Sequence, residues 1–333
     1  MVARLEEIAA RAGVSVATAS RALNNRPGVS EDARTRVLAA VDVLGYQRPD
    51  QLQSRRLSLV GVVVAELENP IFPLFAQAIE QTLPTFRLAA LLATRRAGVA
   101  AEAASVELLR EHGVSGIIFV SGVHSDPHAD LEHYFALREN GVPLALINGP
   151  VAGLDATAVS TDDAAAAATA VRHLHSLGHR RIALVNGPVR YTPARRKSAG
   201  FAAAASAAGD VDAIELCGDY SLEWARGAAE SAARDGVTGF VAASDFLALG
   251  AIQGARAAGR RVPQDVSVVG FDGSAMMNFT DPPLTTLRQP VQALASAAIR
   301  GLAADLEGNP HPRRELLFDA ELVVRGSTSA RIR

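Results

Sequence analysis

Short, continuously apolar segments alternate with longer segments of helical periodicity over most of this 333-residue chain. The apolar segments have the length of buried strands, and the segments between them have the length of helices. Apolar strands that alternate with helices are typical of parallel sheets covered on both faces. The expected strands are 59–64, 88–92, 116–120, 144–147, 182–185, 240–242 and 266–269, and the expected helices include 75–83, 100–111, 162–177 and 245–258.

The number of expected strands is too large for one compact sheet. We therefore predict two doubly wound lobes, with the chain passing from one lobe to the other near residues 155–160. A length of 333 residues and an apolar content of 49% are sufficient for two or three domains with cores of their own. The predicted fold class of this part of the chain is α/β.

The first 46 residues do not follow this alternation, and three short helices are expected there instead. Gly13 stands where a tight turn between two helices needs a residue that tolerates positive φ. Ser15 is expected to cap the second helix, 16–24, and Ser30 is expected to cap the third, which ends at Gly45. The pattern predicts a small helix-turn-helix domain.

The second helix carries small and hydrogen-bonding side chains that fit a DNA major groove. An ordinary surface helix with a good cap is the alternative interpretation. Residues 1–57 hold nine arginines and six acids, a charge of +3, so the rest carries −5 of the total charge of −2. A basic end on an acidic body suits a module that binds a polyanion. The candidate groove-facing residues are Val16, Ala17, Thr18, Ser20, Arg21 and Asn24.

The run LEEIAARAGVSVATASRALNNRPGVSEDARTRVLAAVDVLGY resembles the headpiece of the LacI/GalR family of transcriptional repressors. It matches the family pattern AxxAGVSxxTxSRxLN, followed by VSExxRxRVxxAxxxLGY. Arg4 is a departure, because the family usually has a threonine at that place. The resemblance implies that base edges are faced by Val16, Ala17 and Arg21. It implies that phosphates are held by Ser15, Thr18, Ser20, Asn24 and Tyr46.

Residues 47–58 form the predicted hinge. In the family, a short helix forms here on operator DNA and inserts a leucine into the minor groove. Pro49 and Asp50 match the start of that element, whereas Arg56 occupies the place of the leucine. Arg56 could read a narrow minor groove by its charge, Leu57 could take the wedge role, or the segment could be a plain linker.

The rest of the chain resembles the family's core, which is similar to periplasmic sugar-binding proteins. ENPIFPLFAQAIE, HGVSGIIFVS, VRHLHSLGHRRIALVNGP, ASDFLALGAIQGAR, VPQDVSVVGFDGS and DPPLTTLRQP each have a family counterpart. The implied organisation is a helix-turn-helix DNA-binding headpiece over 1–46, a hinge over 47–58, and a bilobed effector-binding and dimerisation core over 59–333. The N-lobe is expected to hold about 59–157 and 290–318, and the C-lobe about 158–288 and 319–333.

In such folds, the ligand binds between the lobes at the carboxyl ends of the strands. A sugar needs planar hydrogen-bonding groups and a flat apolar face. By resemblance, Phe72 and Tyr220 pack on the ligand, and Asn148 and Asp272 bond to its hydroxyl groups. Phe72 could instead be a core residue, and Asp245 is expected to cap the helix that follows it. The candidate effector residues are Asn69, Phe72, Ser121, Asn148, Arg196, Lys197, Tyr220, Ser244, Asp272 and Gln289.

Two positions of this site depart from the family pattern. Lys197 stands where the family has an arginine, and it follows Arg195 and Arg196. An arginine fork and a lysine point charge hold ligands differently, so the sequence leaves open which cation reaches the effector. Gly273 replaces a polar residue that is common after the aspartate of the GFD motif. Both departures bear on which ligand fits.

The sequence argues against an enzyme. It contains no GxSxG elbow, no Walker GxxxxGKS/T motif and no GxGxxG motif after a strand. Cys217 is the only cysteine, so neither an intrachain disulfide nor a cysteine metal cluster is expected. We predict no catalytic residue, no metal site and no cofactor. No segment is apolar enough for a membrane span or a secretory signal, which indicates a cytoplasmic protein without a membrane partner.

The predicted function is sequence-specific repression of transcription by a homodimer that binds double-stranded operator DNA under the control of a small effector. VAELENPIF, FTDPPLTT and ELVVRGST resemble the maltose-operon repressor type of actinomycetes, so the expected effector is a sugar such as a malto-oligosaccharide. The chain stops soon after ELVVRGST without a heptad segment, so dimers are expected rather than tail-linked tetramers. The alternatives are a purine-repressor-like mode, in which the ligand strengthens DNA binding, and a cytoplasmic sugar-binding protein without a regulatory role.

Overall fold

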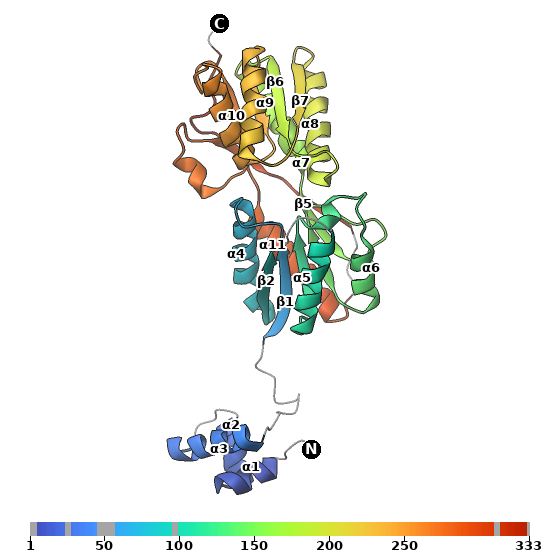
Figure 1. Cartoon of the computed structure of the whole chain (residues 1–333), viewed down its shortest axis with the longest axis vertical. Coiled ribbons are helices and arrows are strands. Elements are labelled where there is room, and N and C mark those ends of the chain that lie inside the picture. Colours follow the sequence, from blue (N-terminus) through green and yellow to red (C-terminus); the bar gives the residue numbers. More distant parts are fainter. Residues whose placement is uncertain (1–4, 24–27, 45–56, 95–98, 310–313, 332–333) are drawn as a thin grey trace. The chain divides into compact units, whose positions relative to one another are not determined.

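The computed structural model describes residues 5–23, 28–44, 57–94, 99–309 and 314–331 (Figure 1). They belong to two compact units, one within residues 1–57 and one over residues 58–333, and each is described by itself. The described part of the first unit is helical, and the second unit holds two six-stranded sheets covered by helices. The predicted combination of a helical headpiece and a two-lobed α/β core is therefore confirmed.

The headpiece contains three helices that share one small core. These helices are α1 (Leu5–Ala12), α2 (Val16–Leu23) and α3 (Glu31–Leu44). Most of the core side chains are small, so the helices approach one another closely. The buried residues are Ile8, Ala9, Ala12, Ala19, Ala22, Leu23, Val37 and Ala40.

The turns and caps of the headpiece follow the sequence signals. Gly13 has a φ of +61° between α1 and α2, a conformation that strains residues with a side chain. Ser15 Oγ accepts a hydrogen bond from the Thr18 backbone N–H at 3.1 Å at the start of α2. Ser30 Oγ accepts one from the Ala33 N–H at 3.3 Å before α3. Each serine thus satisfies a backbone donor that the helix itself leaves unpaired.

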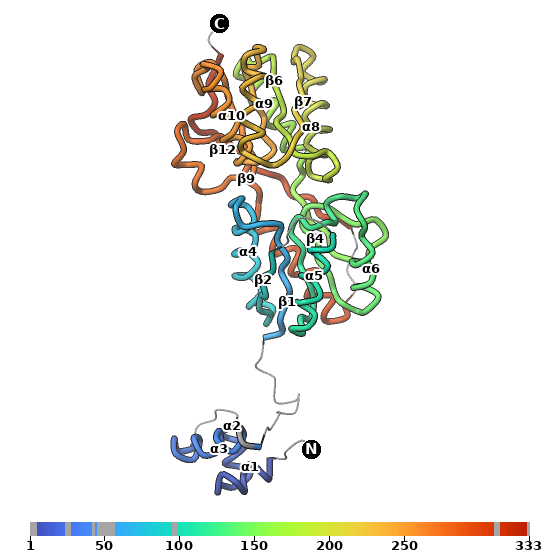
Figure 2. Tube along the Cα trace, viewed as in Figure 1, coloured from blue at the N-terminus to red at the C-terminus, as the bar shows by residue number. Residues whose placement is uncertain are grey.

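The N-lobe of the second unit is built on a parallel sheet with the strand order β11-β5-β4-β3-β1-β2. Its strands are β1 (Ser58–Val64), β2 (Leu88–Thr94), β3 (Gly116–Val120), β4 (Leu144–Ile147), β5 (Thr157–Thr161) and β11 (Leu316–Phe318). One face is covered by α4 (Ile71–Thr82) and α11 (Val291–Leu306), and the other by α5 (Val99–Glu111) and α6 (Glu132–Glu139). The early helix α4 and the late helix α11 lie side by side (Figure 2). Two short 3-10 helices are η2 (Leu83–Phe86) and η3 (Val123–Ser125).

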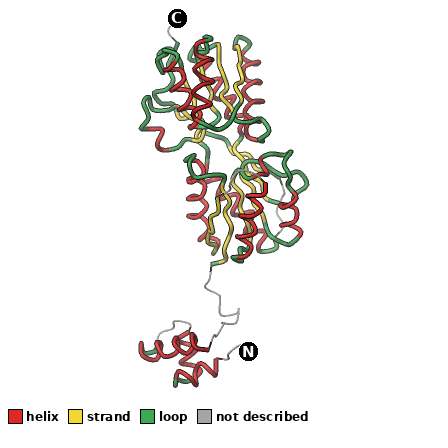
Figure 3. The backbone as a smooth tube through the Cα atoms, viewed as in Figure 1, coloured by secondary structure: helices red, strands yellow, loops and turns green. Residues whose placement is uncertain are grey.

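The C-lobe repeats this layered arrangement with the strand order β12-β10-β9-β8-β6-β7. Its strands are β6 (Arg181–Asn186), β7 (Asp212–Cys217), β8 (Gly239–Ala242), β9 (Ser267–Asp272), β10 (Thr285–Arg288) and β12 (Glu321–Val323). One face is covered by α9 (Leu222–Arg234) and α10 (Asp245–Ala257), and the other by α7 (Asp163–Ser176) and α8 (Thr192–Ala208). Figure 3 shows the strands of each lobe between helices. All strand pairings of this sheet are parallel except that of β12 with β10. A short 3-10 helix, η4 (Ala275–Asn278), follows β9.

The chain passes between the lobes three times: after Thr161, after Arg288 and after Phe318. The Asp162 N–H donates to the Phe318 carbonyl oxygen at 2.8 Å, so two of these crossings lie side by side. The expected start of the C-lobe near residue 158 falls inside β5, which pairs with β4 over residues 157–159 and with β11 over residues 159–161 and so belongs to the N-lobe sheet. Because β5 is buried but rich in threonine and serine, a search for apolar runs missed it.

Candidate functional site

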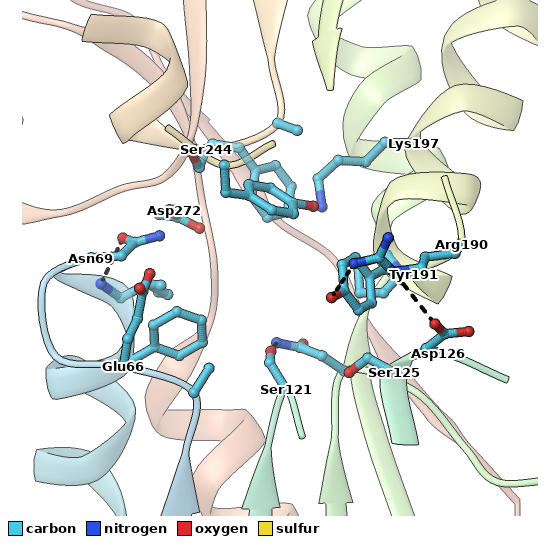
Figure 4. Close-up of a pocket in the computed structure, with 18 of the residues that line it drawn as sticks. Glu66, Asn69, Ser121, Ser125, Asp126, Arg190, Tyr191, Lys197, Ser244 and Asp272 are labelled. Carbon is cyan, nitrogen blue, oxygen red and sulfur yellow. Dashed lines mark hydrogen bonds and ion pairs between the residues drawn. The ribbon is translucent and has the colours of Figure 1, made fainter. Parts of the chain in front are cut away.

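A cavity of about 580 Å³ lies between the two lobes (Figure 4). Its walls come largely from residues that follow the carboxyl ends of parallel strands, as ligand sites in such sheets do. All of the predicted effector residues except Arg196 line this cavity. They are Asn69, Phe72, Ser121, Asn148, Lys197, Tyr220, Ser244, Asp272 and Gln289.

Three of the lining residues have a backbone conformation that is rare for residues with a side chain. Ser121 follows β3 with a φ of 51°, Asn148 follows β4 with a φ of 75°, and Asp272 ends β9 with a φ of 118°. The Asn148 Nδ2 donates to Ser121 Oγ at 2.8 Å, which fixes both side chains at the cavity wall. Strained backbone gathers at binding sites because surrounding structure holds functional groups in place there.

A chain of hydrogen bonds joins the lobes at the cavity wall. Thr161 Oγ1 donates to Gln289 Oε1 at 2.8 Å, and Gln289 Nε2 donates to Asp272 Oδ1 at 2.8 Å. Within the described residues, the buried Asp272 Oδ2 has no hydrogen-bond partner. Burial, together with the charge of Asp245, raises the pKa of Asp272 well above its ordinary value. Asp272 therefore has one carboxylate oxygen bonded to Gln289 and one whose hydrogen-bonding capacity is not used by the described residues.

The cap of α10 differs from the prediction. Ser244, rather than Asp245, accepts the hydrogen bond from the Leu247 N–H, at 3.1 Å. The Asp245 carboxylate instead accepts from the Gly273 and Ser274 N–H groups and from the Thr286 hydroxyl. Burial raises the pKa of Asp245 to about 6, although these hydrogen bonds oppose the shift. Asp245 thus shapes the turn that follows Asp272.

The cations of α8 divide between two environments. Lys197 lines the cavity, forms a buried ion pair with Asp163, and places its Nζ 3.8 Å from the centre of the Phe271 ring. Arg196 does not line the cavity, and its guanidinium donates to both carboxylate oxygens of Glu315 at 2.7 and 2.6 Å. The prediction that Arg196 lies at the effector site is therefore not met by the geometry. Successive helix residues point in different directions, so the two neighbours face different partners.

Aromatic rings supply the flat apolar part of the wall. Phe72, Tyr191, Tyr220 and Phe271 all line the cavity. The Tyr220 ring lies so close to Gly187 that a Cβ there would be 2.1 Å from it. No side chain at residue 187 would fit in that space, so the glycine after β6 leaves room for the Tyr220 ring.

Several lining residues were missed by the sequence reasoning, and they include a contact across the cleft. The Arg190 Nε in the C-lobe lies 3.5 Å from Asp126 Oδ2 in the N-lobe. Arg190 follows β6, and Asp126 follows β3, so the same strand-end rule could have found both. The missed polar and aromatic residues are Glu66, Ser125, Asp126, Arg190, Tyr191 and Phe271.

The second candidate site is the outer face of α2. Ala19, Ala22 and Leu23 point into the headpiece core, which leaves the opposite face of the helix accessible. The predicted residues of this face are exposed (Ser15, Val16, Ala17, Arg21) or half-buried (Thr18, Ser20). Asn24, Tyr46 and Arg56, and also Arg4, lie outside the described residues. The described part of α2 has the side-chain distribution that a groove-reading helix requires.

These two sites, in this order on the chain, define a helix-turn-helix transcriptional regulator with a periplasmic-binding-protein-like core. The family model "Bacterial regulatory proteins, lacI family" matches residues 4–49, and the model "Periplasmic binding protein-like domain" matches residues 171–328. An HTH-type transcriptional regulator encoded in the aml 5′ region of Streptomyces limosus is 49% identical over 98% of this chain and 95% of its own length. The chain therefore belongs to the LacI family.

Further relatives and solved structures agree with this assignment. The HTH-type transcriptional regulator MalR of Streptomyces coelicolor is 48% identical over 99% of this chain and 98% of its own. The Lac repressor dimer bound to operator and the anti-inducer ONPF has a TM-score of 0.77 and 26% identity over 99% of this chain and all of that one. A complex of the regulator CelR with cellobiose has a TM-score of 0.72 and 30% identity over 98% of this chain and 99% of that one.

These relatives are transcriptional regulators, and this protein is a DNA-binding transcriptional regulator as well, rather than an enzyme. Among the described residues, no group of three or more His, Cys, Asp or Glu side chains is placed to hold a metal ion. No helix in the described ranges is both long and apolar enough to cross a membrane.

Proposed function

We propose that this protein represses transcription as an operator-bound homodimer and that a sugar in the inter-lobe cavity controls this binding. The observation that carries the proposal is the cavity itself. The amide and carboxyl groups of Asn69, Asn148 and Asp272 line the same cavity as the rings of Phe72 and Tyr220. Planar hydrogen-bonding groups next to aromatic faces suit the polar edge and apolar face of a sugar ring.

Two comparisons support a glucose oligomer, such as a malto-oligosaccharide, as the effector. One relative that shares about half of its residues with this chain carries the name MalR. One structural neighbour was solved with cellobiose, which is a disaccharide of glucose. A cavity of about 580 Å³ has room for a ligand of that size.

The DNA side of the proposal rests on α2. Val16, Ala17 and Arg21 are proposed to contact base edges from the exposed face of this helix. Ser15, Thr18, Ser20, Asn24 and Tyr46 are proposed to hold phosphates, and Arg56 is proposed to approach the minor groove.

Exposed apolar side chains of the C-lobe support a dimer with a second copy of this chain. Phe279 is 88% exposed and Met276 is 67% exposed, both in or beside η4. Large apolar groups at such exposure favour burial against another surface. A two-fold dimer would place two headpieces on the two halves of a pseudo-palindromic operator.

Control by the effector follows from the connections between the lobes. The cavity has walls from both lobes, so a ligand that bonds to both favours one inter-lobe angle. β1 of the N-lobe follows the hinge segment directly, so a change in the position of the N-lobes changes the spacing of the two headpieces. A preference of a few kcal/mol for one state is enough to shift operator occupancy.

The test is binding of the full chain to DNA selected from a random library, measured by gel shift with and without maltose or maltotriose. We expect a pseudo-palindromic sequence whose binding weakens when the sugar is added. Binding that strengthens with the sugar would instead indicate the purine-repressor-like mode. A chain that selects no sequence and shows no salt-dependent DNA binding would contradict the proposal. Analytical ultracentrifugation is expected to show dimers, and a stable tetramer would contradict that part.

A further inference from the structure

Two groups of polar residues lie at opposite ends of the cavity, apart from Lys197 (Figure 4). Figure 4 shows Glu66, Asn69, Ser244 and Asp272 at one end and Ser125, Asp126, Arg190 and Tyr191 at the other, with Ser121 between them. We call the first set the inner subsite and the second set the outer subsite. The aromatic rings of Phe72, Tyr220 and Phe271 also line the cavity. A ligand with more than one sugar ring could bond to both sets of residues at once.

The outer subsite contains a polar atom that the described protein leaves unused. Ser125 lines the cavity, is only 4% exposed, and its Oγ has no hydrogen-bond partner among the described residues. A buried hydroxyl group without a partner loses free energy relative to one that is bonded. A ligand hydroxyl group at this end would remove that loss.

Arg190 brings directional donors to the same end. Its guanidinium carbon lies 4.7 Å from the centre of the Tyr191 ring, and its Nη2 donates to the Tyr191 hydroxyl at 3.1 Å. The stacked and bonded guanidinium is thereby oriented while part of its fork remains for a ligand. Asp126, 3.5 Å away from Arg190 Nε, adds an acceptor from the opposite lobe. Sugar hydroxyl groups both donate and accept, so this pair of charges suits them.

A buried network holds the segment that carries Ser125 and Asp126. Glu102, which is fully buried, accepts a hydrogen bond from the Val123 N–H at 2.8 Å and one from the Tyr134 hydroxyl. The Tyr134 hydroxyl oxygen in turn accepts from the His124 N–H at 3.1 Å. These contacts fix η3 before any ligand arrives, and a preorganised site loses less entropy on binding.

We infer that the outer subsite binds a second sugar ring and that the effector is therefore a disaccharide or a longer oligosaccharide. This inference rests on the proposed sugar-controlled function. The inner subsite binds one ring, and the outer subsite binds the next ring from both lobes at once. A monosaccharide leaves Ser125 and Arg190 without ligand contacts, so it binds more weakly and holds the lobes together less well.

The test is isothermal titration calorimetry of the full chain with glucose, maltose and maltotriose. Ser125→Ala and Arg190→Gln are each expected to lower the affinity for maltose by about ten- to hundredfold and to change that for glucose less than about twofold. Arg195→Gln is the matched control, because Arg195 is exposed on α8 just after Arg190 in the chain, carries the same charge and does not line the cavity. Asp272→Asn is expected to weaken binding of all three sugars. The melting temperature of each variant checks that the core remains folded.

Equal losses for glucose and maltose in the Ser125 and Arg190 variants, or no loss for either sugar, would overturn the second subsite alone. Wild-type protein that binds glucose as tightly as maltose would also overturn it. A folded wild-type protein that binds none of the sugars but responds to another metabolite would overturn the sugar proposal and this inference together. The two failures are thus distinguishable in one set of titrations.

Discussion

The headpiece and the inter-lobe cavity differ in the burial of the residues proposed to bind DNA and the effector. On α2, Val16, Ala17 and Arg21 are exposed, while the cap bond of Ser15 joins residues three apart. In the cavity, Asp272 is buried, and its partner Gln289 bonds in turn to Thr161, 128 residues away along the chain. The α2 residues proposed to contact DNA are thus at the surface, whereas Asp272 of the cavity is buried and bonded to distant parts of the chain.

Because of this difference in burial, substitutions at the two sites should affect folding differently. An exposed binding residue can be replaced with little effect on folding, because surface substitutions change stability little. A buried polar residue cannot, because its removal leaves a partner unsatisfied. Substitutions of exposed α2 side chains such as Arg21 should therefore affect DNA binding alone, and substitutions of buried polar cavity residues should affect ligand binding and stability together.

The largest effect is expected for Arg21→Ala. Loss of a base contact costs about 1–3 kcal/mol for each headpiece, so a dimer should lose about 2–6 kcal/mol of operator affinity. Sugar affinity and melting temperature should stay at their wild-type values. Arg36→Ala is the control, because Arg36 has the same charge but pairs with Asp32 on α3. Unchanged operator affinity in gel shifts with Arg21→Ala would mean that the reading face of the headpiece has been misidentified.

Lys197→Met tests the cavity side of the comparison. It leaves Asp163 buried without its cation, and breaking such a pair costs about 3–5 kcal/mol. Calorimetry should show a lower melting temperature for the core, in contrast to Arg21→Ala. Replacing both partners, with Asp163→Asn in addition, should recover most of the loss. If Lys197→Met alone is as stable as the wild type, the buried ion pair does not contribute to the stability of the core as proposed.

The stability of the core should depend on pH because of the proton that Asp245 binds. Burial raises the pKa of Asp245 to about 6, so the folded chain binds this proton more tightly than the unfolded chain does. The contribution of this group to the free energy of unfolding therefore falls as pH rises from about 4 to about 6, by on the order of 2 kcal/mol. Asp245→Asn should remove that contribution when melting is followed against pH. An identical slope in the variant and the wild type would contradict this assignment.

The smallest effect is expected from paired serine caps. Ser15→Ala removes the cap of α2 and should destabilise the headpiece by about 1 kcal/mol. Ser244→Ala removes the cap of α10 and should destabilise the core by a similar amount. It should also weaken sugar binding, because Ser244 lines the cavity. Thermal melts and sugar titrations of both variants sharpen the comparison. Weaker sugar binding with Ser15→Ala would show that the two sites are not separable in this way.

The apolar strands of the fold could be predicted because burial on both faces requires continuous apolar sequence. The seven expected strands correspond to β1, β2, β3, β4, β6, β8 and β9. The missed strands lack that sequence for physical reasons. β7 (Asp212–Cys217) pairs with one neighbour only and is largely exposed, and β10 (Thr285–Arg288) buries threonines whose hydroxyl groups are bonded within the core. Such strands can be identified only from the strands that they pair with in the structure, because their composition does not distinguish them.

The cavity residues could be predicted because the ends of parallel strands meet at one edge of the sheet. What could not be predicted was the direction of individual side chains. Lys197 and Arg196 are neighbours on α8, yet only Lys197 lines the cavity. Likewise, Ser244 and Asp245 are both good caps, and the backbone before α10 decides between them. Side-chain direction depends on helix phase, which residue spacing alone does not fix.

The ion pair of Arg196 with Glu315 joins the two lobes. Arg196 belongs to the C-lobe, while Glu315 precedes β11 and also accepts a hydrogen bond from Ser160 in β5, both in the N-lobe. This ion pair connects the lobes near the crossing that follows β11, and neither of its two residues lines the cavity. Arg196→Ala would therefore remove a connection between the lobes without changing any residue that lines the cavity.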